Sequence, residues 1–240
     1  MPYALAVGAV VVAAASFVQG LAGFGIGLVS LAFLPFVMSP TDAVVLMTLY
    51  ATVFCAVIFV PLRRDFLPSG VDALVVGSVL GTPLGVWVLA SVSATLLARL
   101  IGAVLVVIVA LEWSGLSPRR LPGRAWGLGA GVLSGVVGAA VGTPGPPAIV
   151  YMAAQGWSPR TIKANLQAFL VVNQLVILVG YGWAGLLTAQ VWRLAALLAL
   201  PAALGLVAGM RLFDRVDAVK FRRVIFAILL GSGVALLLGA

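Results

Sequence analysis

Eight long apolar runs make up most of the chain, and no charged residue occurs before Asp42. Six runs are close to the ~20 residues that one helical crossing of a bilayer needs: 43–62, 70–92, 95–113, 164–183, 188–210 and 221–239. The other two runs, 3–38 and 125–157, are too long for one crossing, because an α-helix rises about 1.5 Å per residue. Each must turn back near its middle, as two short crossings or as a re-entrant hairpin.

The composition requires lipid as the solvent. Hydrophobic residues make up 63% of the chain and charged residues only 8%, against about 25% charged in an ordinary soluble domain. The apolar runs are continuous and do not alternate at every second residue, as the strands of a membrane barrel would. The sequence therefore predicts an all-α polytopic membrane protein, with residues 1–240 as a single membrane domain.

Both long runs carry glycine near their centres, where the chain has to turn. The first contains Gly20, Gly23, Gly25 and Gly27, and the second contains "SGVVGAAVGTPGPP" over 134–147. Glycine weakens a helix, and proline removes an amide donor and clashes with the preceding turn. We therefore expect a helix break at each cluster.

The two halves of the chain resemble each other in the order of their glycine and proline residues. Three sets of residues match at a constant offset within each set: Gly20, Gly23 and Gly27 with Gly135, Gly138 and Gly142; Ser39–Pro40 with Ser158–Pro159; and Gly81, Gly85 and Arg99 with Gly205, Gly209 and Arg223. This order predicts an internal duplication, with repeats 1–116 and 124–240 and a junction near 117–123. Each repeat would hold one broken or re-entrant hairpin and three transmembrane helices.

The basic residues choose the orientation of these repeats. If each long run is a hairpin, twelve of the fourteen basic residues fall on one side: Arg63, Arg64, Arg119, Arg120, Arg124, Arg160, Lys163, Arg211, Arg215, Lys220, Arg222 and Arg223. Only Arg99 and Arg193 fall on the other. Such a bias marks the cytoplasmic side, so we expect inverted repeats with both termini outside the cytoplasm.

Several functions are excluded by the residue inventory. The net charge of +8 is spread over short loops between apolar runs, which is typical of cytoplasmic loops beside anionic lipid and gives no indication of nucleic acid. The chain has no histidine, and no acidic residue lies deep in a run, so an enzyme, a metal site and a cofactor are not expected. Cys55 is the single cysteine and cannot form an internal disulfide.

The predicted helix breaks could bind an anion without a charged side chain. The first amides of a helix that starts inside the membrane point into the break, where they favour negative charge. We expect Gly23, Gly25 and Gly27 to face Gly142, Thr143 and Gly145 across one cavity. Gln19, Asn173 and Gln174 would add amide groups to this substrate site.

Two alternatives stay open for these residues. The glycines could serve only close helix packing, and the amides could be glue between helices. Two further amides, Asn165 and Gln167, belong to the run 164–183, which also holds Asn173 and Gln174. They lie near the basic end of this run and could be merely interfacial.

The glycine motifs resemble those of the sulfite exporter TauE/SafE-like transporters. The resemblance rests on "GLAGFGIG", "GVVGAAVGTPGPP" and the following "SPRTIKANLQAF", and it spans nearly the whole chain. It implies a multi-pass protein of the bacterial cytoplasmic (inner) membrane that moves sulfite, a sulfonate or a similar small anion. Here "AAVGTPGP" replaces a denser glycine run, which leaves the anion open. An anion channel and a structural membrane protein are the alternatives, and a homodimer is left open.

Overall fold

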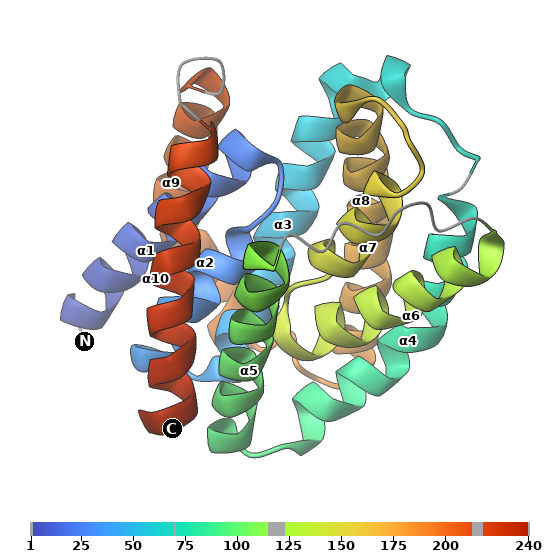
Figure 1. Cartoon of the computed structure of the whole chain (residues 1–240). Helices are drawn as coiled ribbons and strands as arrows, with labels where there is room; N and C mark the ends of the chain where they lie inside the picture. Colours follow the sequence, from blue (N-terminus) through green and yellow to red (C-terminus); the bar gives the residue numbers. More distant parts are fainter. Residues whose placement is uncertain (1, 70, 115–122, 213–217, 240) are drawn as a thin grey trace. The chain divides into compact units, whose positions relative to one another are not determined.

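The computed structural model describes residues 2–69, 71–114, 123–212 and 218–239, and every regular element in these residues is helical (Figure 1). The long helices are α1 (Pro2–Ala22), α3 (Pro40–Leu62), α4 (Asp72–Ser91), α5 (Ala94–Trp113), α6 (Arg124–Val141), α8 (Pro159–Trp183), α9 (Ala189–Leu212) and α10 (Ala218–Gly239). The short ones are α2 (Ile26–Phe33), α7 (Gly145–Ala153), and the 3-10 turns η1 (Leu34–Phe36) and η2 (Arg63–Asp65). Most of the predicted junction at 117–123 lies outside the described residues.

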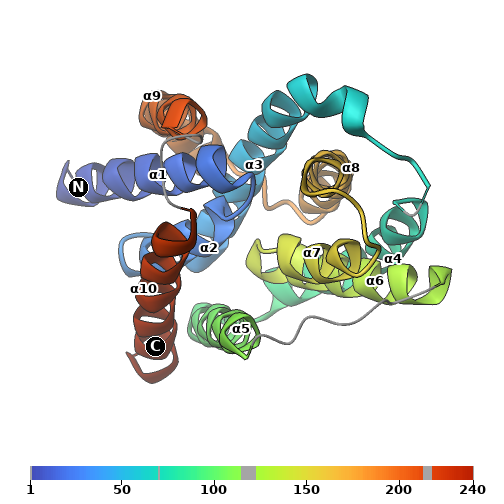
Figure 2. The ribbon, with the colours of Figure 1, turned by 45° about the horizontal axis from the view of Figure 1, so that its top comes forward.

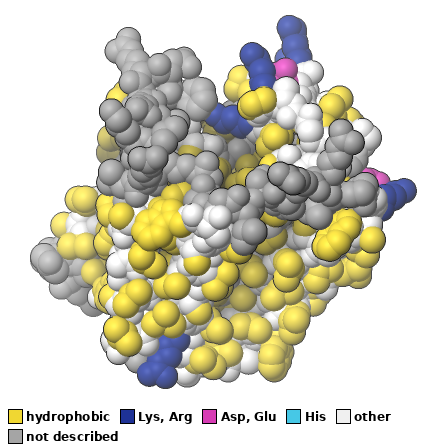
Figure 3. Space-filling view, in the orientation of Figure 1, with side chains coloured by type: hydrophobic (Ala, Val, Ile, Leu, Met, Phe, Trp, Pro, Cys, Tyr) yellow, Lys and Arg dark blue, Asp and Glu magenta, His cyan; other side chains and the backbone are white. Residues whose placement is uncertain are grey.

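The fold confirms the prediction of an all-helical, polytopic membrane protein. Seven of the described helices are long and apolar enough to cross a membrane. Each of the six single-length runs contains one long helix. On the face drawn in Figure 3, hydrophobic side chains spread over the middle and lower part of the described surface, and the basic ones lie in its upper part, at its right edge and at its lower edge. This is the surface that lipid requires.

Both long runs fold as hairpins with a short return helix (Figure 2). In the first hairpin (α1 and α2), Gly8 near the start of α1 lies beside Met38, which follows η1. In the second hairpin (α6 and α7), Gly127 near the start of α6 lies against the ring of Tyr151. The return helices have 8 and 9 residues, about 12–14 Å, which is less than half of the ~30 Å hydrocarbon core. Each long run is therefore a broken helical hairpin with one long arm and one short arm.

The chain divides into two compact units. Unit 1 comprises residues 1–47, 92–115 and 187–240, and unit 2 comprises 48–91 and 116–186. Unit 1 contains the first hairpin with α5, α9 and α10, and unit 2 contains the second hairpin with α4, α8 and most of α3. Each unit therefore draws on both halves of the sequence.

The second hairpin is held in unit 2 by backbone contact between α4 and α6. A Cβ on Gly77, Gly81 or Gly85 of α4 would collide with a backbone carbonyl of α6, at Leu128, Val132 and Val136 respectively. We call this contact the α4–α6 seam. In lipid, where apolar burial does not drive helices together, such close packing of small residues is a main source of association.

The first hairpin is held in unit 1 by the same kind of contact, the α1–α9 seam. A Cβ on Gly205 or Gly209 of α9 would collide with the carbonyl of Ala13 or Phe17 of α1. The two seams correspond when Ala13 is matched with Val132, Phe17 with Val136, and Gly205 and Gly209 with Gly81 and Gly85. This is the predicted sequence match of Gly205 and Gly209 with Gly81 and Gly85. The same alignment places the end of α1 opposite the end of α6, so the predicted match of Gly20, Gly23 and Gly27 with Gly135, Gly138 and Gly142 is displaced from it by one helical turn.

Two ion pairs lie at one end of unit 2. Arg124 at the start of α6 pairs with Asp72 at the start of α4. Arg160 in the first turn of α8 pairs with Asp65 of η2, with 2.8 Å between Nε and Oδ2. All four residues belong to the side predicted to be cytoplasmic. The ion pairs are largely exposed, so they contribute little to stability.

Filling the α4–α6 seam should unfold unit 2. Gly81→Val puts a branched side chain against the carbonyl of Val132, and backbone on both sides leaves nothing that can move aside cheaply. We expect a loss of about 3 kcal/mol or more, seen as a lower melting temperature and an aggregated peak in size-exclusion chromatography. The control is Gly129→Val in α6, where a Cβ meets nothing within 4 Å; equal damage from both variants would contradict the assignment.

Candidate functional site

The first helix break spans the three residues between α1 and α2. Gly23 and Gly25 have φ angles of +83° and +111°, a region that side chains other than glycine rarely adopt. Gly25 is the N-cap of α2, and no side chain at that position caps the helix. The glycines predicted for a turn are therefore required by backbone conformation.

Gln19 closes this first break with its own side chain. Its Oε1 accepts the amide N–H of Ile26, the first residue of α2, at 3.1 Å. Its Nε2 donates to the carbonyl of Gly23 at 3.3 Å. The residue is 1% exposed. The side chain that we predicted as a substrate ligand is thus engaged in joining the two helices of the hairpin.

The second break, between α6 and α7, is built differently. Gly142 has φ +67° and its N–H donates to the carbonyl of Gly138, which ends α6. The return helix then begins with Gly145, Pro146 and Pro147. The two prolines have no amide N–H, so α7 offers fewer backbone donors than we expected for an anion-binding helix start. Side chains must supply the missing donors.

Several buried polar atoms of the second hairpin and of α8 have no partner in the part of the chain that the structure describes. They come from α6, the break itself and the middle of α8, and they are Ser134 Oγ, Thr143 Oγ1, both side-chain atoms of Asn173 and Gln174 Oε1. We call these four residues the break cluster. Among the described residues, none of these atoms finds a hydrogen-bond partner. A buried polar group left in this state costs about 1–3 kcal/mol, which indicates that something else completes the cluster.

The position of α8 against the second hairpin is fixed by two contacts. The hydroxyl of Tyr181 donates to the carbonyl of Ala139 in the last turn of α6, at 2.7 Å. A Cβ on Gly138 would lie 3.4 Å from Asn173 Oδ1. Glycine at 138 therefore lets the Asn173 amide lie directly beside the helix end that forms the break.

The two breaks differ at the position that bridges the first of them. The carbonyls of Gln19 and Gly138 accept the N–H of Gly23 and Gly142, the glycines that follow α1 and α6. Gly138 has no side chain, so it cannot bridge the second break as Gln19 bridges the first. Buried hydroxyls without a partner among the described residues occur in both hairpins: Ser16 and Ser30 in the first, Ser134 and Thr143 in the second.

The structure brings the predicted site residues together in two groups. Gln19, Gly23, Gly25 and Gly27 lie in unit 1, and Gly142, Thr143, Gly145, Asn173 and Gln174 lie in unit 2. A single cavity between the groups stays a prediction. Sequence reasoning missed Ser134, a buried hydroxyl about two helical turns before the break. Asn165 and Gln167 are both 0% exposed, so their side chains lie inside the protein.

Re-entrant hairpins with a broken, neutral, polar centre define a class of membrane transport proteins, in which non-helical backbone at membrane depth is tolerated only inside the protein. The family model of the sulfite exporter TauE/SafE matches residues 8–236, and the chain belongs to this family. It is a transporter and not an enzyme, and a multi-pass protein of the bacterial inner membrane.

A curated relative agrees with this assignment. The chain is 30% identical to the "Probable sulfite/organosulfonate exporter TauE" of Cupriavidus necator over 243 residues, which cover 95% of this chain and 91% of the relative. No solved structure matches the chain.

Removing the Gln19 amide should loosen the first hairpin. Gln19→Met keeps the length of the side chain but leaves the Ile26 N–H unpaired, so we expect a loss of about 1–3 kcal/mol. The fall in melting temperature in detergent measures this loss of stability. Gln190→Met, at the exposed start of α9, is the matched control and should melt like the parent. If the Gln19 variant also melts like the parent, Gln19 does not hold the break.

Proposed function

We propose that the protein is a secondary transporter that moves a small organosulfur or sulfur oxyanion across the cytoplasmic membrane, bound at the glycine-rich helix breaks. The family and the name of the Cupriavidus relative support the sulfur chemistry of the substrate. The proposal for the site rests on the break cluster, because its buried hydroxyl and amide groups can donate hydrogen bonds to the oxygens of sulfite or a sulfonate.

A neutral site suits transport of an anion. Charge-assisted hydrogen bonds from hydroxyl and amide donors to an oxyanion are stronger than ordinary ones, so Thr143 and Asn173 can replace part of the hydration shell. An arginine in the same place would hold the anion tightly in both access states and slow its release. Hydroxyl and amide dipoles alone bind the anion loosely enough for it to dissociate.

The first break has a supporting part in this proposal. Gln19 holds the start of α2, and Gly23, Gly25 and Gly27 present backbone without side chains to a ligand. Gly142 and Gly145 do the same around Thr143. Gln174, one residue after Asn173, supplies a second amide of the break cluster.

Energy coupling through a carboxylate relay is not part of the proposal. Asp42 and Glu112, the acidic residues that we single out for testing, stand at run ends. We propose flux driven by the anion gradient and the membrane potential, or coupling by protons carried on the substrate. If neutralising either acid abolished pH-driven uptake but left exchange intact, this part would be wrong.

Counterflow separates a transporter from the alternative of an anion channel. Liposomes that contain the purified protein and unlabelled sulfite or a two-carbon sulfonate should accumulate the labelled anion transiently above equilibrium, because an alternating site exchanges one anion for another. A channel would give ionic currents and no such overshoot. A structural protein without transport would give neither result.

Asn173 should be needed for transport but not for stability. Asn173→Leu removes both unpaired amide atoms and fills a similar volume, so we expect no fall in melting temperature. The apparent affinity for the anion should fall about tenfold or more, since a hydrogen bond to a charged group contributes about 1.5–3 kcal/mol. Thr143→Val, which removes only the hydroxyl, should weaken affinity in the same direction.

The control for these variants is Val172→Leu, at the exposed neighbour of Asn173 on α8. It should change neither transport nor melting. A fall in melting temperature for Asn173→Leu with unchanged affinity would show that the amide is glue between helices, and the proposed site would then lie elsewhere.

A further inference from the structure

A second unpaired donor lies in unit 2 near the other end of α8, about two helical turns from the break cluster. Asn165 is 0% exposed. Its Oδ1 accepts the N–H of Leu67 at 2.8 Å, which fixes the orientation of the amide. Its Nδ2 has no partner among the described residues. The bond to Leu67 satisfies the Oδ1 acceptor of Asn165 but not its Nδ2 donor.

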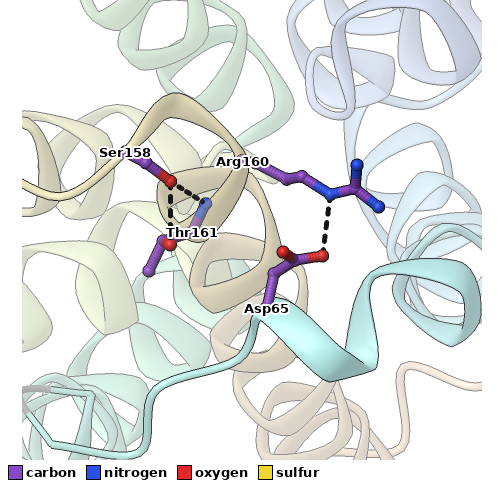
Figure 4. A network of polar contacts seen from close by, with 4 residues as sticks. All are labelled: Asp65, Ser158, Arg160 and Thr161. Carbon is purple, nitrogen blue, oxygen red and sulfur yellow. Dashed lines mark hydrogen bonds and ion pairs between the residues drawn. The ribbon is translucent and has the colours of Figure 1, made fainter.

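The segment that covers Asn165 is basic and is tied to α8 at two points. Besides the bond from Leu67 to Asn165, Asp65 of η2 accepts a hydrogen bond from Arg160 Nε at 2.8 Å (Figure 4). The start of α8 is itself capped, since Ser158 Oγ accepts the N–H of Thr161 at 3.1 Å. Arg63 and Arg64 of η2 are exposed on the same segment.

We propose that Asn165 Nδ2 forms an entry subsite for the oxyanion at the cytoplasmic end of unit 2. The inference rests on the proposed function and adds a second binding position to it. Exposed arginines raise the local concentration of an anion. The buried amide then replaces part of its hydration shell before it reaches the break cluster.

Phe169 separates the two binding positions. It lies one helical turn after Asn165 and one turn before Asn173 on the same face of α8, and it is 0% exposed. An anion bound at Asn165 is therefore distinct from an anion bound at Asn173. The distance along the helix between these two residues is about 12 Å.

Asn165→Asp tests the subsite without cutting the tie to Leu67. The carboxylate can still accept the Leu67 N–H, but the donor becomes an oxygen that repels an anion. In liposomes with known orientation, we expect the apparent KM from the cytoplasmic face to rise about tenfold. The KM from the opposite face should change less than twofold. An equal rise from both faces, or no change from either, would overturn the proposal.

Leu67→Pro is the matched control for a purely structural role. It removes the N–H that Asn165 accepts and leaves Nδ2 in place; Phe66 already has an extended ψ of 129°, which a following proline favours. We expect this variant to keep the parent KM. If Leu67→Pro raises the cytoplasmic KM and Asn165→Asp does not, Asn165 is only an anchor for the loop.

Two further arms identify the ligand. The effect of Asn165→Asp should be the same in vesicles of phosphatidylcholine alone and with phosphatidylglycerol; an effect that needs the anionic lipid would assign Nδ2 to a lipid phosphate and overturn the proposal. Wild-type protein that moves no oxyanion would instead refute the proposed function itself.

If Asn165→Asp does not fold, Asn165→Cys in a Cys55→Ala background gives a second test. The substrate anion should slow modification of the new thiol by a reagent added from the cytoplasmic side. The same rate with and without the substrate would overturn the subsite.

Discussion

Contact between helix backbones, made possible by glycine, is the interaction on which each unit depends. Helices gain little by burying apolar surface from lipid, because lipid tails are as apolar as their own side chains. The α4–α6 seam and the α1–α9 seam replace that missing driving force with dispersion between surfaces that fit closely. Since α1 and α6 are also the first helices of the hairpins, the seams hold in place the elements that break inside the membrane.

A break at membrane depth leaves polar backbone that must be satisfied by protein or ligand. The two hairpins meet this requirement in different ways. Gln19 pairs with the N–H of Ile26, the first amide of α2, and so bridges the first break. Pro146 and Pro147 have no amide N–H, so the start of α7 leaves fewer donors unpaired. At the second break, the polar side chains of the break cluster are the groups that we propose for the anion.

Much of the architecture can be predicted from the sequence, because the length of an apolar run and the lipid around it determine whether that run crosses the membrane. A run of 20 apolar residues can only be a crossing, and a run of 36 with central glycines can only be a crossing that turns back. Partner choice does not follow in this way: the glycines at 77, 81 and 85 predict a close approach, but nothing in their spacing says that α6 is the helix approached. The role of Gln19 could not be predicted either. A glutamine beside a glycine cluster has the same sequence pattern whether it binds a ligand or caps a helix.

The predicted duplication does not extend to the residues that we propose for binding. If Ser39–Pro40 is matched with Ser158–Pro159, Asn173 and Gln174 of α8 correspond to Phe54 and Cys55 of α3. Phe54 and Cys55 are buried and Asn173 and Gln174 are buried, so the two helices present different chemistry at equivalent depth. Repeated seams need only small residues at fixed spacing, and both halves retain them. The seams and the proposed binding residues are therefore subject to different constraints. Small residues for close packing recur in both halves, whereas the amides that we propose for the anion occur on α8 and not at the matched positions of α3.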